Sequence, residues 1–163
     1  MNLARIIGAA CTDDLFCEQL MSAPVPTTQN FGFAFASADA AELLRIFPVS
    51  DPQGSSAVAD LCRQIADYIC PKRICPGLAG SGAQSAIGTA VLDDAFREAF
   101  LTDPINAAAH RGIDLTSAER FALARLVFAK HPDGIPPSLK RDRLRVLFKA
   151  LGQAITRPLA ATA

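Results

Sequence analysis

The stretch LDDAFREAFLTDPINAAAHRGIDLTSAE, residues 92–119, decides the fold because most of its residues mark a helix start, a helix end or a buried helix face. Its first apolar residues recur at helical spacing, namely Leu92, Phe96, Ala99 and Phe100. That spacing predicts a helix over 84–102. Asp103 and Pro104 then form an N-cap with proline at the first helical position. They predict a short helix that ends at Arg111, before a C-cap glycine at Gly112.

The residues that follow predict two further helices. Thr116 and Glu119 have the spacing of a capping box, so a helix is expected over about 117–130. A turn follows at 131–134, and the prolines after it begin a last helix that runs to about Ile155.

Similar signals for helix starts and ends occur about 80 residues earlier, in the stretch TDDLFCEQLMSAPVPTTQNFGFAFASAD at residues 12–39. The repeat extends beyond these stretches: without a gap, residues 7–54 and 87–134 share about fifteen identities in about 48 aligned positions, which is several times the number expected by chance. The pattern therefore indicates a tandem duplication. The first copy predicts one helix or two paired short helices over 2–22, a helix over 38–47 and a final helix over about 56–69.

We therefore expect an all-α fold with two similar four-helix units. The first unit covers residues 1–70, a Pro/Gly-rich linker covers 71–84, and the second unit covers 85–156. Units this small bury little surface alone and usually pack on a neighbour. The sequence leaves open whether these two units pack on each other.

Charge and hydropathy exclude several classes of protein. The 163 residues have no net charge, although the first half carries about −3 and the second about +3. That asymmetry is too small to indicate nucleic-acid binding. No run of 18 apolar residues exists, so we expect no membrane span and a cytoplasmic protein with reduced thiols.

The second copy resembles the nitrile-hydratase-like leader peptides of ribosomally made modified peptides. The resemblance is carried by Leu92-Asp-Asp-x-Phe-Arg-x-x-Phe-Leu-x-Asp-Pro104 and by Gly112-Ile-Asp-Leu-Thr-x-x-Glu119. The first copy is similar to the nitrogen-fixation-type leader peptides through Asp14-Leu15, Leu20 and the Gly32–Ser37 segment. The helical arrangement is also similar to the small α subunit of protocatechuate 4,5-dioxygenase and to the recognition domain of split borosin precursors.

These resemblances imply recognition rather than catalysis. The expected function is a non-catalytic adaptor or accessory subunit that binds a partner protein, such as a peptide-modifying enzyme or a larger catalytic subunit. Two alternatives stay open: a precursor of a modified peptide, and the small subunit of a ring-cleaving dioxygenase. The chain departs from a standard precursor because it has two leader-like units and no obvious core peptide after the second.

Two groups of residues are candidates for partner binding. The first lies around Gly32 and Gly112 and comprises Phe31, Phe33, Phe35, Ile113 and Leu115. We interpret Phe33 and Phe35 as apolar plugs and Phe31 as an exposed contact. The second group is the basic face of the last helix, with Lys140, Arg141 and Arg143, which is either a solvated face or a docking surface for an acidic partner. Nucleic acid is an unlikely partner because this face lacks aromatic residues for stacking.

The remaining reactive residues do not predict a metal, a cofactor or a catalytic site. The five cysteines all lie in the first half, without the spacing of a zinc knuckle. We expect buried thiols, with Cys70 and Cys75 as possible sites of modification. His110 and His131 have no neighbour with metal-ligand spacing, which favours structural roles. The pair Asp13-Asp14 points in diverging directions on a helix and cannot form a catalytic dyad.

Overall fold

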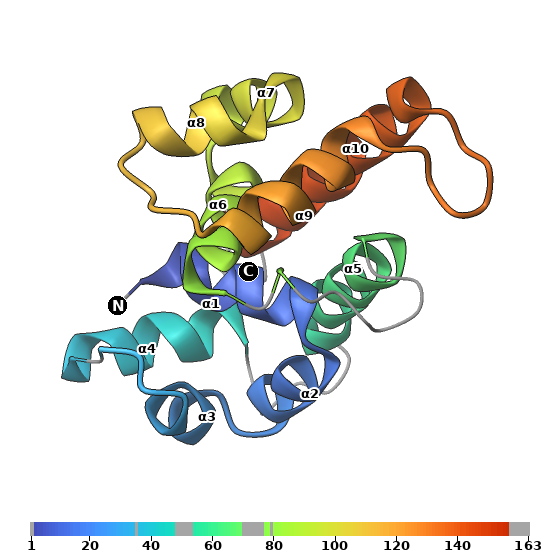
Figure 1. Ribbon diagram of the computed structural model, residues 1–163. Helices are drawn as coiled ribbons and strands as arrows, with labels where there is room; N and C mark the ends of the chain where they lie inside the picture. The colour runs from blue at the N-terminus through green and yellow to red at the C-terminus, as the bar shows by residue number, and fades with distance from the viewer. Residues whose placement is uncertain (1, 35, 48–53, 70–76, 79, 157–163) are drawn as a thin grey trace.

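All regular secondary structure that the computed structural model describes is α-helical, which confirms the predicted fold class (Figure 1). The described residues are 2–34, 36–47, 54–69, 77–78 and 80–156. The helices of the first half are α1 (Leu3–Thr12), α2 (Asp14–Ser22), α3 (Pro24–Asn30), α4 (Ser37–Ile46) and α5 (Gly54–Ile69). Those of the second half are α6 (Ser81–Leu92), α7 (Asp94–Thr102), α8 (Pro104–His110), α9 (Ser117–Phe128) and α10 (Pro137–Thr156).

Each half has five described helices rather than the four that we expected. The segment 84–102, predicted as one helix, is broken at Asp93, whose backbone is extended and whose carboxylate accepts the Phe96 N–H at 2.9 Å. Asp13 does the same for Phe16 at 3.0 Å. The prediction of a single helix was therefore wrong because an N-cap aspartate starts a new helix inside a continuous apolar pattern.

The helix ends repeat at the same offset of about 80 residues. Gly32 and Gly112 follow α3 and α8 with φ of 79° and 74°, as expected for left-handed C-cap residues. At the start of α9, Thr116 and Glu119 form the predicted capping box. Its counterpart at α4 keeps one of these hydrogen bonds, because Asp39 accepts the Ala36 N–H at 2.7 Å.

The two halves meet through α1 and α6, which cross at the centre of the molecule (Figure 1). A Cβ atom at Gly8 would lie 1.7 Å from the Gln84 carbonyl oxygen, and one at Gly88 would lie 1.5 Å from the Ala4 carbonyl oxygen. Only glycine allows the two backbones to approach this closely. Ala4 and Gly8 correspond to Gln84 and Gly88 in the duplication. A pseudo-twofold axis between α1 and α6 therefore maps each of these two close contacts onto the other.

One continuous core joins the halves, so they are packed together rather than held apart by the linker. It includes Ile7, Phe16 and Leu43 from the first half and Ile87, Phe100 and Phe148 from the second. Each of these side chains is fully buried. The core therefore fixes the relative position of the last helix of each half, α5 and α10.

The halves differ beneath α2 and α7. The buried Arg97 of α7 donates to the carbonyl oxygens of Ala90 at 2.8 Å and Val91 at 2.9 Å, at the C-terminal end of α6. A cation is favourable at this end of a helix. The corresponding residue of α2 is Cys17, which lies in a cluster of buried thiols with Cys11 and Cys62. The same backbone arrangement therefore surrounds a buried cation in one half and a cluster of thiols in the other.

Candidate functional site

A groove of about 800 Å³ lies between α5 and α10, and we call it the α5–α10 groove. The two helices lie on the same side of the molecule, next to the loop between α9 and α10 (Figure 1). The groove is lined by Gln64, Asp67, Tyr68, His131, Asp133, Ile135, Leu139, Asp142, Arg143, Val146 and Leu147. Because it takes side chains from both halves, it exists only in the packed chain.

The inner wall of the groove is a stacked pair of rings. His131 is buried, and its ring stacks on that of Tyr68 with centroids 4.6 Å apart. The Asp133 N–H donates to Nδ1 of His131 at 3.1 Å, so the imidazole proton lies on Nε2. Nε2 then donates to the Tyr68 carbonyl oxygen at 3.2 Å. Both imidazole nitrogens are occupied, which makes His131 a structural link between the loop and α5.

The Tyr68 hydroxyl is buried and has no hydrogen-bond partner among the described residues. Burial raises the pKa of the Tyr68 phenol, and the Asp133 carboxylate adds to this effect while Arg143 opposes it. A buried polar group without a partner costs roughly 1–3 kcal/mol. Tyr68 lines the groove, so a ligand whose hydrogen-bonding atom reached this hydroxyl would recover that free energy.

The outer rim of the groove is apolar. Leu139 and Val146 are 56% and 66% exposed, and they lie two turns apart on the same side of α10. Ile135 and Leu147 continue this apolar surface into the groove. Exposed large apolar side chains gathered beside a cavity are typical of an interaction site.

The charges around the groove are mainly negative. Of the described residues, Asp67, Asp133 and Asp142 line it, and Arg143 is the one lysine or arginine among them. Asp142 is partly neutralised by Arg145, whose Nη1 lies 2.6 Å away. The groove therefore offers an apolar surface with a surplus of carboxylates, which suits an apolar segment that carries positive charge.

Among the described residues of the groove, the one histidine is not free to act as a general base. A general base needs a free acceptor within hydrogen-bond reach of the group that it deprotonates. His131 offers none, since its two ring nitrogens are engaged. In the described part of the chain, no group of three His, Cys, Asp or Glu side chains could hold a metal ion.

A shallower depression occurs once in each half, between α2 and α3 and between α7 and α8. The seven residues that line the first depression all have counterparts in the second at the same offset. Glu18 and Glu98 are identical, but most of the other pairs differ in chemistry. The depression therefore follows from the repeated helix geometry and does not indicate a shared ligand.

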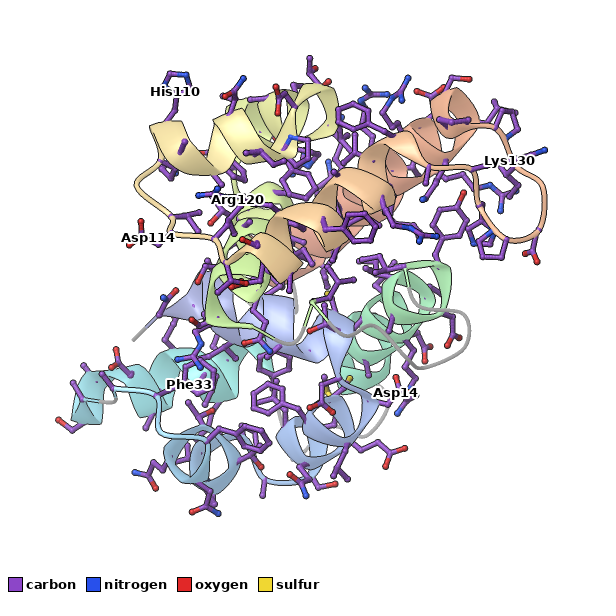
Figure 2. The ribbon with its side chains drawn as sticks, viewed as in Figure 1. Asp14, Phe33, His110, Asp114, Arg120 and Lys130 are labelled. Carbon is purple, nitrogen blue, oxygen red and sulfur yellow. The ribbon has the colours of Figure 1, made fainter. Side chains whose placement is uncertain are left out.

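The predicted apolar residues around the glycine caps are mostly turned inward. Phe33 is 7% exposed and lies between the helices of the first half, which confirms it as an apolar plug (Figure 2). Ile113 and Leu115 are half-buried against the core. Phe31 is exposed and meets the Phe16 ring edge-on at 4.6 Å. Phe35 lies outside the described residues, and the others do not form a common open surface.

The predicted basic residues of α10 separate into two kinds. Lys140 is only 5% exposed, and its Nζ donates to the carbonyl oxygens of Arg125 and Ala129 at the end of α9. Burial lowers the pKa of the Lys140 ammonium. Arg141 donates to the Val127 carbonyl oxygen at 3.3 Å. Lys140 is therefore a structural cap rather than part of a solvated face or a docking surface, whereas Arg143 is exposed and lines the groove.

The described cysteines are free and buried, as expected for reduced core thiols. A hydrogen bond with Cys62 and burial raise the pKa of Cys17, and a hydrogen bond with Cys11 does the same for Cys62. Thiols in this state are poor nucleophiles because the thiolate is the reactive form. Cys70 and Cys75, the possible sites of modification, lie outside the described residues. His110 is exposed and points away from α8 (Figure 2).

Tyr68, Leu139 and Val146 line the groove but were not among the residues predicted from the sequence. One signal was available, because Leu139 and Val146 are spaced seven residues apart on the side of the last helix that we interpreted as polar. Nothing in the sequence pairs Tyr68 with His131, since the two residues are 63 positions apart.

Comparison with protein-family models, with curated proteins and with solved structures finds no match to this chain. In the part of the chain that the structure describes, no helix is both long and apolar enough to span a membrane.

Proposed function

We propose that this protein is a non-catalytic helical recognition module that holds a segment of a partner protein in the α5–α10 groove. The observation that carries the proposal is the buried Tyr68 hydroxyl without a partner, next to the exposed side chains of Leu139 and Val146. A bound segment would cover the two apolar side chains and supply the missing hydrogen bond.

The charges of the groove define the segment that fits it best. Its apolar side chains would pack on Leu139 and Val146, and its lysines or arginines would face Asp67 and Asp133. Exposed charges of this kind steer association and add specificity, whereas the buried apolar contacts supply most of the affinity. The partner segment is therefore apolar and basic.

The resemblance to leader peptides and to the dioxygenase subunit supports the same class of function, since both act by engaging a larger protein. The precursor hypothesis stays a prediction, because it concerns Cys70 and Cys75, which lie outside the described residues. The dioxygenase-subunit hypothesis is a special case of the proposal, in which the partner is the catalytic subunit.

Selection of peptides from a random display library against the folded chain tests this function. We expect the bound peptides to be enriched in apolar and basic residues and to lose affinity about tenfold or more for the Val146→Asn variant, which places an unpaired amide against their apolar side chains. The matched control is Leu15→Asn, which places the same amide at an exposed leucine outside the groove. Peptides that bind wild type and Val146→Asn equally, or that show no basic enrichment, would contradict the proposal.

A further inference from the structure

Helix α9 presents apolar residues on two opposite faces. Its inner face buries Leu123, Leu126 and Val127 in the core. On its outer face, Phe121 is 66% exposed and Phe128 is 50% exposed. At 3.6 residues per turn these two rings lie about 20° apart around the helix axis, so they form one stripe. A helix that is apolar on both faces is normally covered on both.

The first half shows that the fold does not require this stripe. Phe121 corresponds to Ala41 of α4, and the neighbouring Arg120 corresponds to Ala40. The Arg45 guanidinium of α4 is held by Glu42 at 2.6 Å. Arg125, the counterpart of Arg45, has its guanidinium 5.8 Å from the Phe121 ring centroid. The outer face of α9 thus adds the Phe121 ring and the Arg120 guanidinium, which the corresponding positions of α4 lack.

The charge of this face is positive. Arg120, Arg125 and Lys130 are exposed on it or at its end, and Figure 2 shows Lys130 pointing outward from the loop. Glu119, the one carboxylate in α9, is 5% exposed and accepts backbone N–H groups from Ala83 and Thr116. It therefore contributes little to the outer surface, and the face complements an acidic partner.

We propose that the outer face of α9, formed by Arg120, Phe121, Arg125, Phe128 and Lys130, docks an acidic amphipathic helix of a partner protein. The partner's apolar side chains would pack on Phe121 and Phe128, whose two-turn spacing matches positions i and i+7 of a helix. Carboxylates on the partner helix would pair with Arg125, whose guanidinium lies over the Phe121 ring. No α9 residue lines the α5–α10 groove, so this inference is independent of the proposed function.

Fluorescence anisotropy with the full chain tests the inference. The probe is a labelled model helix with leucines at i, i+3, i+4 and i+7 and glutamates on the remaining positions, compared with a second peptide in which lysines replace the glutamates. We expect the glutamate peptide to bind more tightly than the lysine peptide, with an affinity that falls as salt is added. Phe121→Ala, which reproduces Ala41, should weaken binding about tenfold or more.

Two controls separate this site from the groove and from a membrane. Val146→Asn should leave binding of the glutamate peptide unchanged, whereas Arg125→Glu should weaken it. Failure of the glutamate peptide to bind, equal binding of both peptides, or no effect of Phe121→Ala overturns the inference. Phe121-dependent binding to vesicles of phosphatidylserine and phosphatidylcholine, without binding to the glutamate peptide, also overturns it and identifies a lipid surface instead.

Discussion

Replacing Gly88 by alanine should destabilise the protein strongly, because this glycine sets the distance between α1 and α6. The new Cβ would lie 1.5 Å from the Ala4 carbonyl oxygen, whereas carbon atoms in proteins pack favourably at about 3.5–4.0 Å. The two central helices would have to separate by roughly 2 Å, which loosens the core on both sides. Overpacking typically costs about 1–3 kcal/mol and occasionally more.

A second effect acts in the opposite direction. Alanine stabilises a helix interior by about 1 kcal/mol relative to glycine. We expect the steric term to exceed it, since the clash is with backbone that cannot rotate away, and we predict a net loss of about 2 kcal/mol or more. Urea unfolding followed by far-UV circular dichroism measures this loss. A Gly88→Ala variant as stable as wild type, or more stable, would refute the close packing of α1 on α6.

Two comparisons sharpen the result. In Gly112→Ala the new Cβ would meet no atom within 4 Å, so the only cost is the backbone strain of a positive φ of 74°. This strain should lower the free energy of unfolding by about 1–2 kcal/mol. Gly8→Ala should cost about as much as Gly88→Ala, because its Cβ meets the Gln84 carbonyl oxygen at 1.7 Å. The double variant should lose less than the sum, since one separation of the helices relieves both clashes.

Two further predictions concern titratable groups. The hydrogen bond from Arg111 holds the pKa of Asp93 below its ordinary value, so this stabilisation is complete above about pH 4 and is lost as pH falls through the folded-state pKa. The free energy of unfolding should therefore fall less between neutral and acid pH in Arg111→Met than in wild type. The difference should be about 1 kcal/mol or less, because the pair is exposed. An identical pH dependence of the unfolding free energy in the two proteins would contradict the assignment. Cys11, Cys17 and Cys62 are buried, and the pKa values of the last two are raised, so peptide mapping should find all three unmodified by N-ethylmaleimide at neutral pH until denaturant unfolds the chain. Rapid native labelling of Cys17 would contradict this burial.

The sequence predicted the features of the fold that depend on neighbouring residues. The left-handed glycine at Gly112 and the capping box of Thr116 and Glu119 are local, and both are present. The break at Asp93 is also local, but the apolar pattern continues through it and concealed the N-cap. Gly88 could not be interpreted, because a glycine inside a helical pattern does not reveal which backbone approaches it.

The candidate site was harder to predict because its parts are distant in the chain. Tyr68 and His131 come from different halves and meet only when α5 packs beside the loop before α10. Lys140 looked like one member of a solvated basic face, yet its stem lets the ammonium reach the end of α9. Burial of that kind depends on tertiary contacts that helical periodicity does not encode.

Methyl-detected nuclear magnetic resonance can detect a partner segment bound in the α5–α10 groove. Titration of the chain with a selected apolar, basic peptide should shift the methyl signals of Leu139, Val146 and Leu147 and give intermolecular contacts to the Tyr68 ring. The methyl groups of Leu15, exposed but outside the groove, should stay unchanged. Binding that shifts Leu15 or other distant methyl groups while the groove signals remain unchanged would contradict the account.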